Sequence, residues 1–531
     1  MPEILWWKQG IIYQIYPRSF QDSDSDGVGD LNGIRSRLDY LTWLGIYAIW
    51  LSPIYPSPMA DFGYDISDYC GIDKRFGSLK DFDRLVDEAH ERHLKVILDF
   101  VPNHTSEDHP WFVDSRRSRN SAKRNWYIWR DPGPDGGPPN NWISNFGGSA
   151  WEFDEHTGQY YYHAFLKEQP DLNWRNAAVR DAMHEVLRFW MRRGVDGFRV
   201  DVMWHLIKDD RFRDNPPNPG YEDEHPEIQR LLQVNSADHP DVHEVVRELR
   251  AVVDEFPERV LIGEIYLPIE RLVAYYGQDL SGAHLPFNFQ LIETAWHAST
   301  IASLIAEYEN ALPEGGWPNW VLGNHDKRRI AARIGPQQAR VAAMLLLTLR
   351  GTPTMYYGDE IGMPDVAIPP EAVQDPWEHN EPGLGLGRDP QRTPMQWNRG
   401  ASAGFSEAKP WLPVSKDYAE RNVEAASADE RSILWLYRKL IEVRSRSRAL
   451  SVGEFGLLAS SEDTLLYHRS SENERLTVAL NFDHEEKRLE LPATGRPYSI
   501  LLSTALDRTG TIAGTQLTLR ADEGVIVGQA L

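Results

Sequence analysis

The chain has 531 residues, which is too long for one ordinary domain and predicts two or three domains or one large barrel with insertions. Hydrophobic residues make up 41% and charged residues 25% of the chain, which excludes wholesale disorder. A formal net charge of −23 would repel nucleic acid and anionic membranes, so neither is expected as a partner. The single cysteine, Cys70, excludes an intrachain disulfide and a cysteine-based zinc site. Without a signal-peptide pattern or a run of membrane-spanning length, the sequence predicts a cytoplasmic protein.

Strand-like and helix-like segments alternate from the amino terminus. Apolar, β-branched runs predict strands at 11–16, 47–51 and 94–101, and apolar residues at helical spacing predict helices at 31–44 and 79–93. The pattern then breaks over residues 103–172, which are rich in Pro, Gly, Asn and Trp. This composition predicts an inserted subdomain of loops and short strands.

The alternation resumes after Asn176 and supplies five more strands. They are predicted at 197–200, 260–265, 284–287, 320–322 and 353–356, with helices at 179–193, 244–255, 299–312 and 336–349. Eight strands with helical crossovers indicate an α/β protein with a (β/α)8 TIM barrel.

The remainder of the chain differs from the barrel pattern. A polar stretch over 363–428 precedes a closing helix at 431–444, and short alternating runs at 464–468, 476–481 and 498–502 predict an antiparallel β-domain. We therefore expect barrel segments 1–102 and 173–450, an inserted subdomain B 103–172 and a C-terminal β-domain 451–531.

Three acids follow predicted barrel strands. Asp201, Glu264 and Asp326 lie at or just past the ends of the fourth, fifth and seventh strands, where TIM barrels carry their reactive groups. A single acid at such a position is usually structural, but three clustered acids cost stability unless they are used. Two carboxylates on either side of a glycosidic bond are the machinery of glycoside hydrolysis.

The neighbours of two of these acids predict different roles. Arg199 lies two residues before Asp201 on the same side of the strand, and we expect it to keep that carboxylate ionised, as a nucleophile must be. Glu264 lies between Gly263 and Ile265, so partly apolar surroundings are expected to raise its pKa, as a general acid requires.

Four short segments carry a family resemblance. DFVPNH (99–104), GFRVDV (197–202), GEIY (263–266) and GNHD (323–326) resemble, in order, the motifs of the α-amylase family of glycoside hydrolases. The segment GRDPQRTPMQW (387–397) is typical of the family's α-glucosidase and oligo-1,6-glucosidase branch.

The resemblance implies specific roles for individual residues. Asp201 matches the nucleophile, Glu264 the general acid/base and Asp326 a third carboxylate that binds sugar hydroxyls. The other matches are sugar ligands: His104, Arg199 and His325 at the cleaved position, Asp61 with Arg388 at the pocket bottom, Tyr64 as an aromatic platform and Phe165 as a second wall. Arg392 is an equal physical candidate to Arg388, and ordinary core packing is the alternative for Tyr64.

A separate acidic loop follows the first strand. Asp22, Asp24 and Asp26 stand at positions 1, 3 and 5, Gly27 at 6 and Asp30 at 9, as in a calcium loop. Gly33 occupies the place of the EF-hand glutamate, so the loop is not an EF-hand. Resemblance to the glucosidase branch implies a structural Ca²⁺ with the Val28 carbonyl as a further ligand; Mg²⁺ and a plain acidic turn are the alternatives.

Together these features predict a retaining, exo-acting α-glucosidase for small neutral α-glucosides, with transfer to sugar or alcohol acceptors. A sucrose isomerase or trehalose synthase would share the same catalytic set, and a non-catalytic transporter-subunit barrel is less expected because all three acids are present. In relatives, a valine at the position of Val202 tends to accompany α-1,6 activity, although strand packing also explains it. The run 327–329 (Lys-Arg-Arg) departs from the family pattern in a loop that borders the acceptor side. The sequence does not distinguish a monomer from a homo-oligomer.

Overall fold

The computed structural model describes residues 5–493 and 495–529. Eight parallel strands form its central sheet: β1 (Ile12–Ile15), β2 (Ala48–Leu51), β3 (Lys95–Phe100), β7 (Gly197–Val200), β8 (Val260–Gly263), β9 (Leu285–Pro286), β10 (Asn319–Val321) and β11 (Thr352–Tyr356). Their order is β10-β11-β1-β2-β3-β7-β8-β9. A parallel bridge between Asn288 and Trp320 links the two edge strands, so the sheet nearly closes and confirms the predicted barrel.

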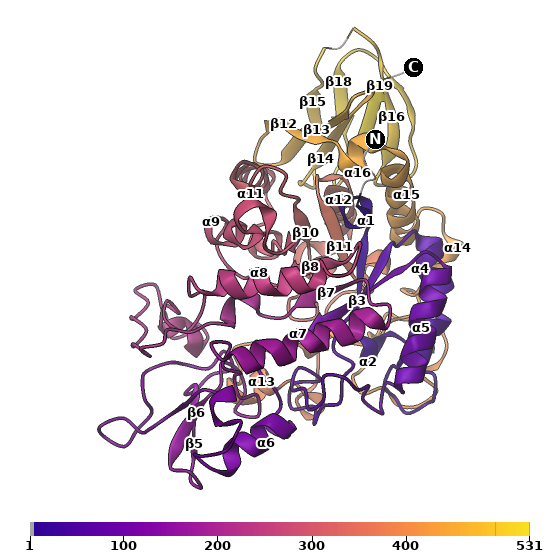
Figure 1. Ribbon diagram of the computed structural model, residues 1–531. Coiled ribbons are helices and arrows are strands. Elements are labelled where there is room, and N and C mark those ends of the chain that lie inside the picture. The colour runs from indigo at the N-terminus through magenta and orange to yellow at the C-terminus, as the bar shows by residue number, and fades with distance from the viewer. Residues whose placement is uncertain (1–4, 494, 530–531) are drawn as a thin grey trace.

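Helices surround the barrel (Figure 1). The longer ones are α5 (Leu79–Glu91), α7 (Ala177–Arg192), α8 (Val242–Val253), α11 (Ala298–Ala311), α12 (Ile330–Thr348) and α15 (Ile433–Arg446). Shorter helices are α1 (Trp6–Gln9), α2 (Pro17–Phe20), α9 (Ile269–Leu272), α10 (Gln290–Glu293), α13 (Pro376–Asn380), α14 (Val423–Ala428) and α16 (Arg448–Val452). Helix α5 illustrates the pattern: a Ser78–Asp81 capping box starts it, and its apolar stripe is buried.

The helix predicted over 31–44 is interrupted. It forms α3 (Leu31–Ser36) and α4 (Leu38–Leu44), with Arg37 between them outside helical geometry. The Arg37 guanidinium binds Gln21 Oε1 and stacks on the Trp397 ring at 4.0 Å. These long-range contacts outweigh local helix propensity at the junction. The helix ends at Gly45, which adopts φ = 95°.

The segment after β3 contains a three-stranded antiparallel sheet in the order β4-β6-β5. Its strands are β4 (Trp129–Arg130), β5 (Trp151–Asp154) and β6 (Gln159–Tyr162). A helix, α6 (Pro110–Arg117), precedes them and was not predicted, because eight residues give too little periodicity to recognise. Since β3 runs directly into this segment, the segment stands at the carboxyl ends of the barrel strands.

The C-terminal part is an antiparallel β-domain, as predicted. A six-stranded sheet has the order β12-β13-β14-β19-β16-β17, and β15 pairs with β18. The strands are β12 (Glu454–Ser460), β13 (Thr464–Ser471), β14 (Glu474–Asn481), β15 (Lys487–Glu490), β16 (Tyr498–Ser503), β17 (Gly510–Ile512), β18 (Gln516–Leu519) and β19 (Gly524–Gln529). This domain and the inserted segment lie at opposite ends of the molecule (Figure 1).

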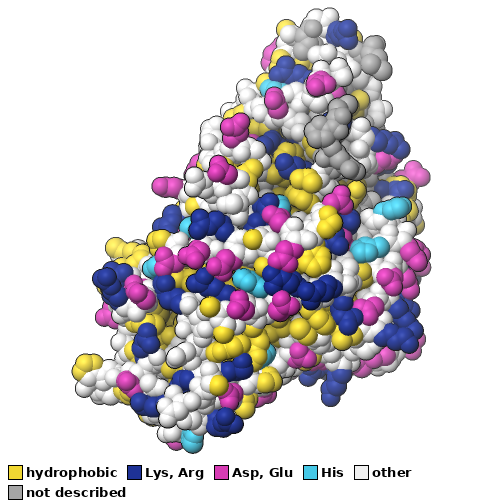
Figure 2. Space-filling model, viewed as in Figure 1, with side chains coloured by type: hydrophobic (Ala, Val, Ile, Leu, Met, Phe, Trp, Pro, Cys, Tyr) yellow, Lys and Arg dark blue, Asp and Glu magenta, His cyan; other side chains and the backbone are white. Residues whose placement is uncertain are grey.

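Acidic and basic side chains are interspersed over α7 and α8 on the face seen in Figure 2. Arg180 and Arg188 of α7 bind Glu248 and Glu255 across the helix pair, at 2.8 Å and 2.5 Å. Within the described residues, the structure contains no helix that is both long and apolar enough to cross a membrane.

Candidate active site

A buried arginine at the carboxyl end of β7 binds three carboxylates. Arg199 Nη1 lies 2.8 Å from Asp99 Oδ1 and 2.6 Å from Asp201 Oδ1. Its Nη2 lies 2.6 Å from Glu264 Oε1. The acids come from the neighbouring strands β3, β7 and β8, so the sheet order brings them together. One guanidinium thereby holds the two candidate catalytic carboxylates close to each other.

The backbone after Asp201 is bent into an unusual conformation. Val202 has φ = 36° and ψ = 48°, the left-handed region, which is costly for a β-branched residue. The bend lets the Val202 N–H donate to Glu264 Oε2 at 2.7 Å. Local strain thus serves to position the Glu264 carboxylate.

Burial decides the protonation of the carboxylate pair. Burial raises the pKa of Glu264, although the Arg199 charge opposes the shift, as predicted from its apolar sequence neighbours. Burial and the Glu264 charge also raise the pKa of Asp201. Arg199 opposes the rise at both acids, because the same guanidinium binds them both. That Arg199 keeps Asp201 ionised stays a prediction. The pair favours holding one proton between them.

The third carboxylate is held ionised. Asp326 Oδ1 accepts from Arg392 Nη2 at 2.8 Å and from Arg388 Nη1 at 3.3 Å, while His325 Nε2 lies 3.2 Å from its Oδ2. Burial alone would raise the pKa of Asp326, but His325 and the two arginines outweigh it and hold that pKa well below its usual range. Asp326 is therefore a permanent anion beside the pair.

A buried ion-pair cluster lines the pocket beside Asp326. Arg388 Nη2 binds Asp61 Oδ1 at 2.6 Å, and its Nε binds Asp375 Oδ2 at 2.7 Å. Asp375 was missed from the sequence, since it sits in the irregular stretch before α13. Of the two candidate arginines, Arg388 lines the pocket, whereas Arg392 is fully buried behind it and donates to the His325 carbonyl oxygen and Asp326.

Two neutral histidines, His104 and His325, and Tyr64 lie among the carboxylates of the site. His325 Nε2 lies 2.7 Å from the Tyr64 hydroxyl, which donates to Asp99 Oδ2 at 3.1 Å. His325 Nδ1 lies 2.8 Å from the side-chain nitrogen of Gln14. Burial lowers the pKa of His325 well below its usual value and that of His104 to about 4. Both rings are therefore neutral hydrogen-bonding groups near neutral pH.

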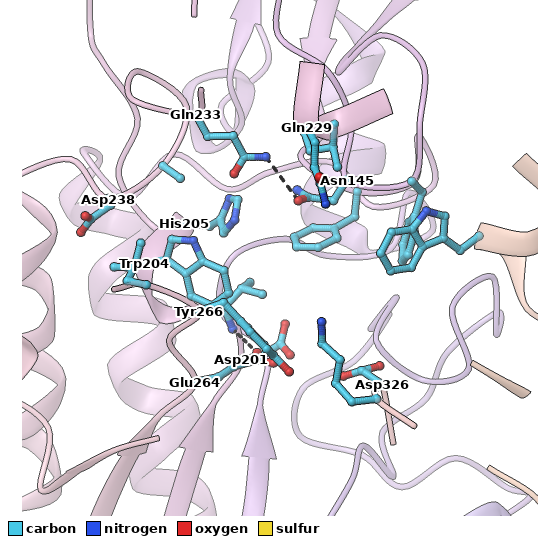
Figure 3. A pocket seen from close by; sticks show the side chains of 18 of the residues that line it. Asn145, Asp201, Trp204, His205, Gln229, Gln233, Asp238, Glu264, Tyr266 and Asp326 are labelled. Carbon is cyan, nitrogen blue, oxygen red and sulfur yellow. Dashed lines mark hydrogen bonds between the residues drawn. The ribbon is translucent and has the colours of Figure 1, made fainter. Parts of the chain in front are cut away.

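These residues surround a pocket of about 830 Å³. Figure 3 shows Asp201, Glu264 and Asp326 at one end and Gln229, Gln233 and Asn145 at the other. Of the predicted catalytic and sugar-binding residues, all but one line this pocket: Asp61, Tyr64, His104, Phe165, Asp201, Glu264, His325, Asp326 and Arg388. The exception, Arg199, is fully buried and acts from behind the carboxylates.

Residues 14–453 match the family model described as "Alpha amylase, catalytic domain". The chain belongs to the α-amylase family. This confirms the resemblance that its four motifs carry.

Proteins similar to this chain have several described activities. A probable alpha-glucosidase from Rhizobium meliloti (strain 1021) is 40% identical over 515 residues, which cover 92% of each chain. The alpha-glucosyl transfer enzyme XgtA matches with a TM-score of 0.95 and 38% identity, covering 99% of this chain and 100% of that one. The trehalulose synthase MutB from Pseudomonas mesoacidophila MX-45 matches with a TM-score of 0.91 and 34% identity over 100% of both chains. Membership of the α-amylase family alone therefore leaves the reaction outcome open.

The predicted calcium loop of this α-amylase family member is partly assembled. Oxygens of Asp22, Asp24 and Asp30 lie within 4.8 Å of one another, whereas Asp26 is outside this group and accepts from the Val28 N–H at 2.8 Å. Burial and three neighbouring carboxylates raise the pKa of Asp24. Convergent carboxylates that repel one another fit a hard cation with oxygen ligands.

Sequence reasoning missed one wall of the pocket altogether. It is formed by apolar side chains from the long connection between β7 and α8 and from the turn after β8, namely Trp204, Ile228, Leu231, Leu232, Val234 and Leu267. The connection has no period of 2 or 3.6, so the sequence offered no signal for these positions.

Proposed function

We propose that this member of the α-amylase family is a retaining, exo-acting α-glucosidase. The carrying observation is the buried ion pair in the pocket wall beside the catalytic acids. Arg388 binds Asp61 at 2.6 Å and also reaches Asp326 at 3.3 Å, so this pair would close the pocket next to the third carboxylate. Such a pocket favours a terminal sugar over the middle of a polysaccharide chain.

The residues divide the chemistry among them. Asp201 attacks the anomeric carbon while Glu264 protonates the leaving oxygen, and Glu264 then takes a proton from the incoming water or alcohol. The shared Arg199 keeps the two carboxylates close, which suits the short separation of a retaining pair, ~5–5.5 Å. Asp326, as a permanent anion, accepts from sugar hydroxyls and stabilises positive charge in the transition state.

The second candidate function is a sugar isomerase on the same scaffold. The similarity to the trehalulose synthase MutB supports this candidate. The catalytic residues would be identical, because isomerisation differs only in returning the glucosyl group to the retained leaving sugar. Product analysis on sucrose separates the two: an isomer with little free glucose supports the isomerase.

A glucose-release assay on maltose, isomaltose, sucrose and trehalose tests the proposal. We expect glucose, with the α-anomer appearing first. The isomaltose to maltose ratio tests the α-1,6 preference suggested by Val202, which lines the pocket. An Asp201→Asn variant should fold normally and lose turnover by at least about 10³-fold. An active Asp201→Asn protein, or no release by the unaltered protein from any of the four sugars, contradicts the proposal.

A structural Ca²⁺ belongs to the same proposal. Asp22, Asp24 and Asp30 would hold the ion, which would neutralise their mutual repulsion and fix the loop after β1. Residues remote in sequence hold the loop in place. Ser406 Oγ donates to Asp22 Oδ2 at 2.5 Å, and the backbone N–H of Trp411 donates to the Gly27 carbonyl at 3.0 Å. A cytoplasmic location stays a prediction, for which cell fractionation is the test.

A further inference from the structure

Two glutamates outside the catalytic set join three separate segments beside the pocket. Glu381 Oε1 accepts from the Glu227 backbone N–H at 2.8 Å, and its Oε2 accepts from the Trp377 indole N–H at 2.9 Å. Glu227 Oε2 in turn accepts from the Gly148 N–H at 2.8 Å. These bonds connect the inserted segment after β3, the connection between β7 and α8, and helix α13, which are remote from one another in sequence.

All three segments line the pocket. Phe146 comes from the inserted segment, Ile228 from the connection between β7 and α8, and Trp377 from α13. Figure 3 shows Asn145 and Gln229, the sequence neighbours of Phe146 and Ile228, at the end of the pocket opposite the catalytic acids. The two glutamates therefore fix the relative positions of three parts of the pocket wall.

The Glu381 side chain packs directly against the turn 144–148 of the inserted segment. Gly147 in this turn has φ = 81°, the left-handed region that favours glycine, and a Cβ atom there would come within 2.8 Å of Glu381 Cγ. Glycine at this position thus leaves the space that the Glu381 side chain occupies between the turn and α13.

Helix α13 links the position of Glu381 to that of an arginine in the pocket. Glu381 directly follows the helix, and Asp375 directly precedes it. Asp375 Oδ1 accepts from the Trp377 backbone N–H at 2.8 Å, and its Oδ2 accepts from Arg388 Nε at 2.7 Å. The Trp377 ring also meets the Phe146 ring edge-on at 5.5 Å, and the Arg388 guanidinium lies 5.0 Å from the centre of the Phe146 ring. A shift of α13 would therefore move Arg388 within the pocket.

Only a carboxylate satisfies both donors at Glu381. Each of its oxygens accepts one N–H, whereas a glutamine would turn its NH2 group toward one of the two donors. Glu227 differs, because only its Oε2 binds the inserted segment, while its Oε1 lies 3.5 Å from the exposed Arg230. A glutamine at position 227 can therefore keep the contact with Gly148.

We propose that Glu381 is a positioning residue for recognition of the terminal sugar, because it holds α13 and the turn 144–148 so that Arg388 and Asp61 meet the sugar in a fixed geometry. The inference rests on the proposed α-glucosidase function, in which the pair of Arg388 and Asp61 binds the non-reducing end. Loss of Glu381 weakens this binding equally in the ground state and in the transition state, which raises KM and leaves kcat unchanged.

Steady-state kinetics test the proposal on the best substrate among maltose, isomaltose, sucrose and trehalose, with glucose as the inhibitor. Glu381→Gln should raise the KM of the substrate and the Ki of glucose by about fivefold or more, while kcat stays within about twofold. Gly147→Ala presses on Glu381 from the other side and should raise the same two constants. Glu227→Gln should raise them less than Glu381→Gln, because it keeps an acceptor for Gly148.

Glu371 supplies the matched control. It is exposed on the same irregular stretch before α13, and Glu371→Gln removes the same charge as Glu381→Gln. The KM and the Ki of Glu371→Gln should equal those of the unaltered protein. Thermal melting of all four variants checks that they are folded.

The outcomes distinguish this proposal from the proposed α-glucosidase function. If the unaltered protein cleaves none of the four sugars, the α-glucosidase assignment fails. If it cleaves them and Glu381→Gln keeps the KM and the Ki of the unaltered protein, the positioning role is wrong and the hydrolase assignment stands. A loss of kcat with an unchanged KM and Ki would mean that Glu381 only supports the fold, which also overturns the positioning role.

Discussion

At the scale of single residues, the position of one proton governs the chemistry. Burial raises the pKa of Glu264, so its acid form persists to higher pH than the ordinary value of ~4.3 allows. Activity that needs this proton is present below the folded pKa of Glu264 and is lost as pH rises through it. We therefore predict a basic limb in the pH profile of kcat/KM on maltose that belongs to Glu264.

The Glu264→Gln variant isolates this limb. On α-glucosyl fluoride, whose leaving group needs no proton, the fluoride burst of Glu264→Gln should proceed and should lack the basic limb. Maltose turnover by the same variant should fall by about 10²–10⁴-fold, the usual contribution of general acid catalysis. A basic limb that survives in the burst would assign the proton to another group.

Asp99 and Asp375 mark the limit of prediction for individual residues. Strand ends marked Asp201, Glu264 and Asp326, and the resemblance to the α-amylase family implied the other pocket residues. Asp99 was visible at a strand end, but its contacts with Arg199, at 2.8 Å, and with the Tyr64 hydroxyl, at 3.1 Å, depend on the closed barrel. Asp375 binds Arg388 from an irregular stretch, where no local pattern indicates a partner.

At the scale of elements, the loop 22–30 permits a test for bound Ca²⁺. One substitution should shift the melting temperature in opposite directions with and without the ion. With Ca²⁺ bound, Asp24→Asn should lower the melting temperature because a charged ligand is lost. In EDTA the same substitution should raise the melting temperature relative to the unaltered protein, since Asp24 is then repelled by Asp22, Asp26 and Asp30. Excess Ca²⁺ at ~100 times its Kd should stabilise the unaltered protein by about 2.7 kcal/mol.

An acid elsewhere on the surface provides the control. Asp87 on α5 is exposed, and Asp87→Asn should respond to Ca²⁺ and EDTA like the unaltered protein. If Asp24→Asn has the same effect with and without Ca²⁺, the loop is an ordinary acidic turn.

Helices were predictable where the hydrophobic periodicity extends over many residues. They were not predictable where tertiary contacts determine the local backbone conformation. Helices α5, α7 and α8 have buried stripes at helical spacing, so their existence followed from the sequence. The break at Arg37 depends on Trp397, which is remote in sequence, and could not be read locally. The apolar wall is likewise created by the folded path of the connection between β7 and α8.

At the scale of the whole molecule, Arg469 binds the C-terminal domain to the barrel at a helix end that Arg444 of the barrel also supports. Helix α12 of the barrel ends at Thr348, and the carbonyls of its last turn need donors. Arg469 of β13 donates to the Thr348 carbonyl at 2.6 Å, and Arg444 of α15 donates to those of Leu347 and Leu349 at 3.0 Å and 3.1 Å. Burial lowers the pKa of Arg444 to about 9 and that of Arg469 to about 10, so both stay charged at neutral pH.

This arrangement predicts that the barrel and the β-domain unfold together. Arg469→Ala removes the donor to Thr348 and to the Gly453 carbonyl, at 2.9 Å, inside the interface. Each buried carbonyl left without a donor costs about 1–3 kcal/mol, so calorimetry should give one transition at a clearly lower temperature. Arg475→Ala is the control, because Arg475 is exposed on β14 and contacts the His468 ring. If Arg469→Ala instead produces an early transition for the β-domain and leaves that of the barrel unchanged, the two domains are energetically independent.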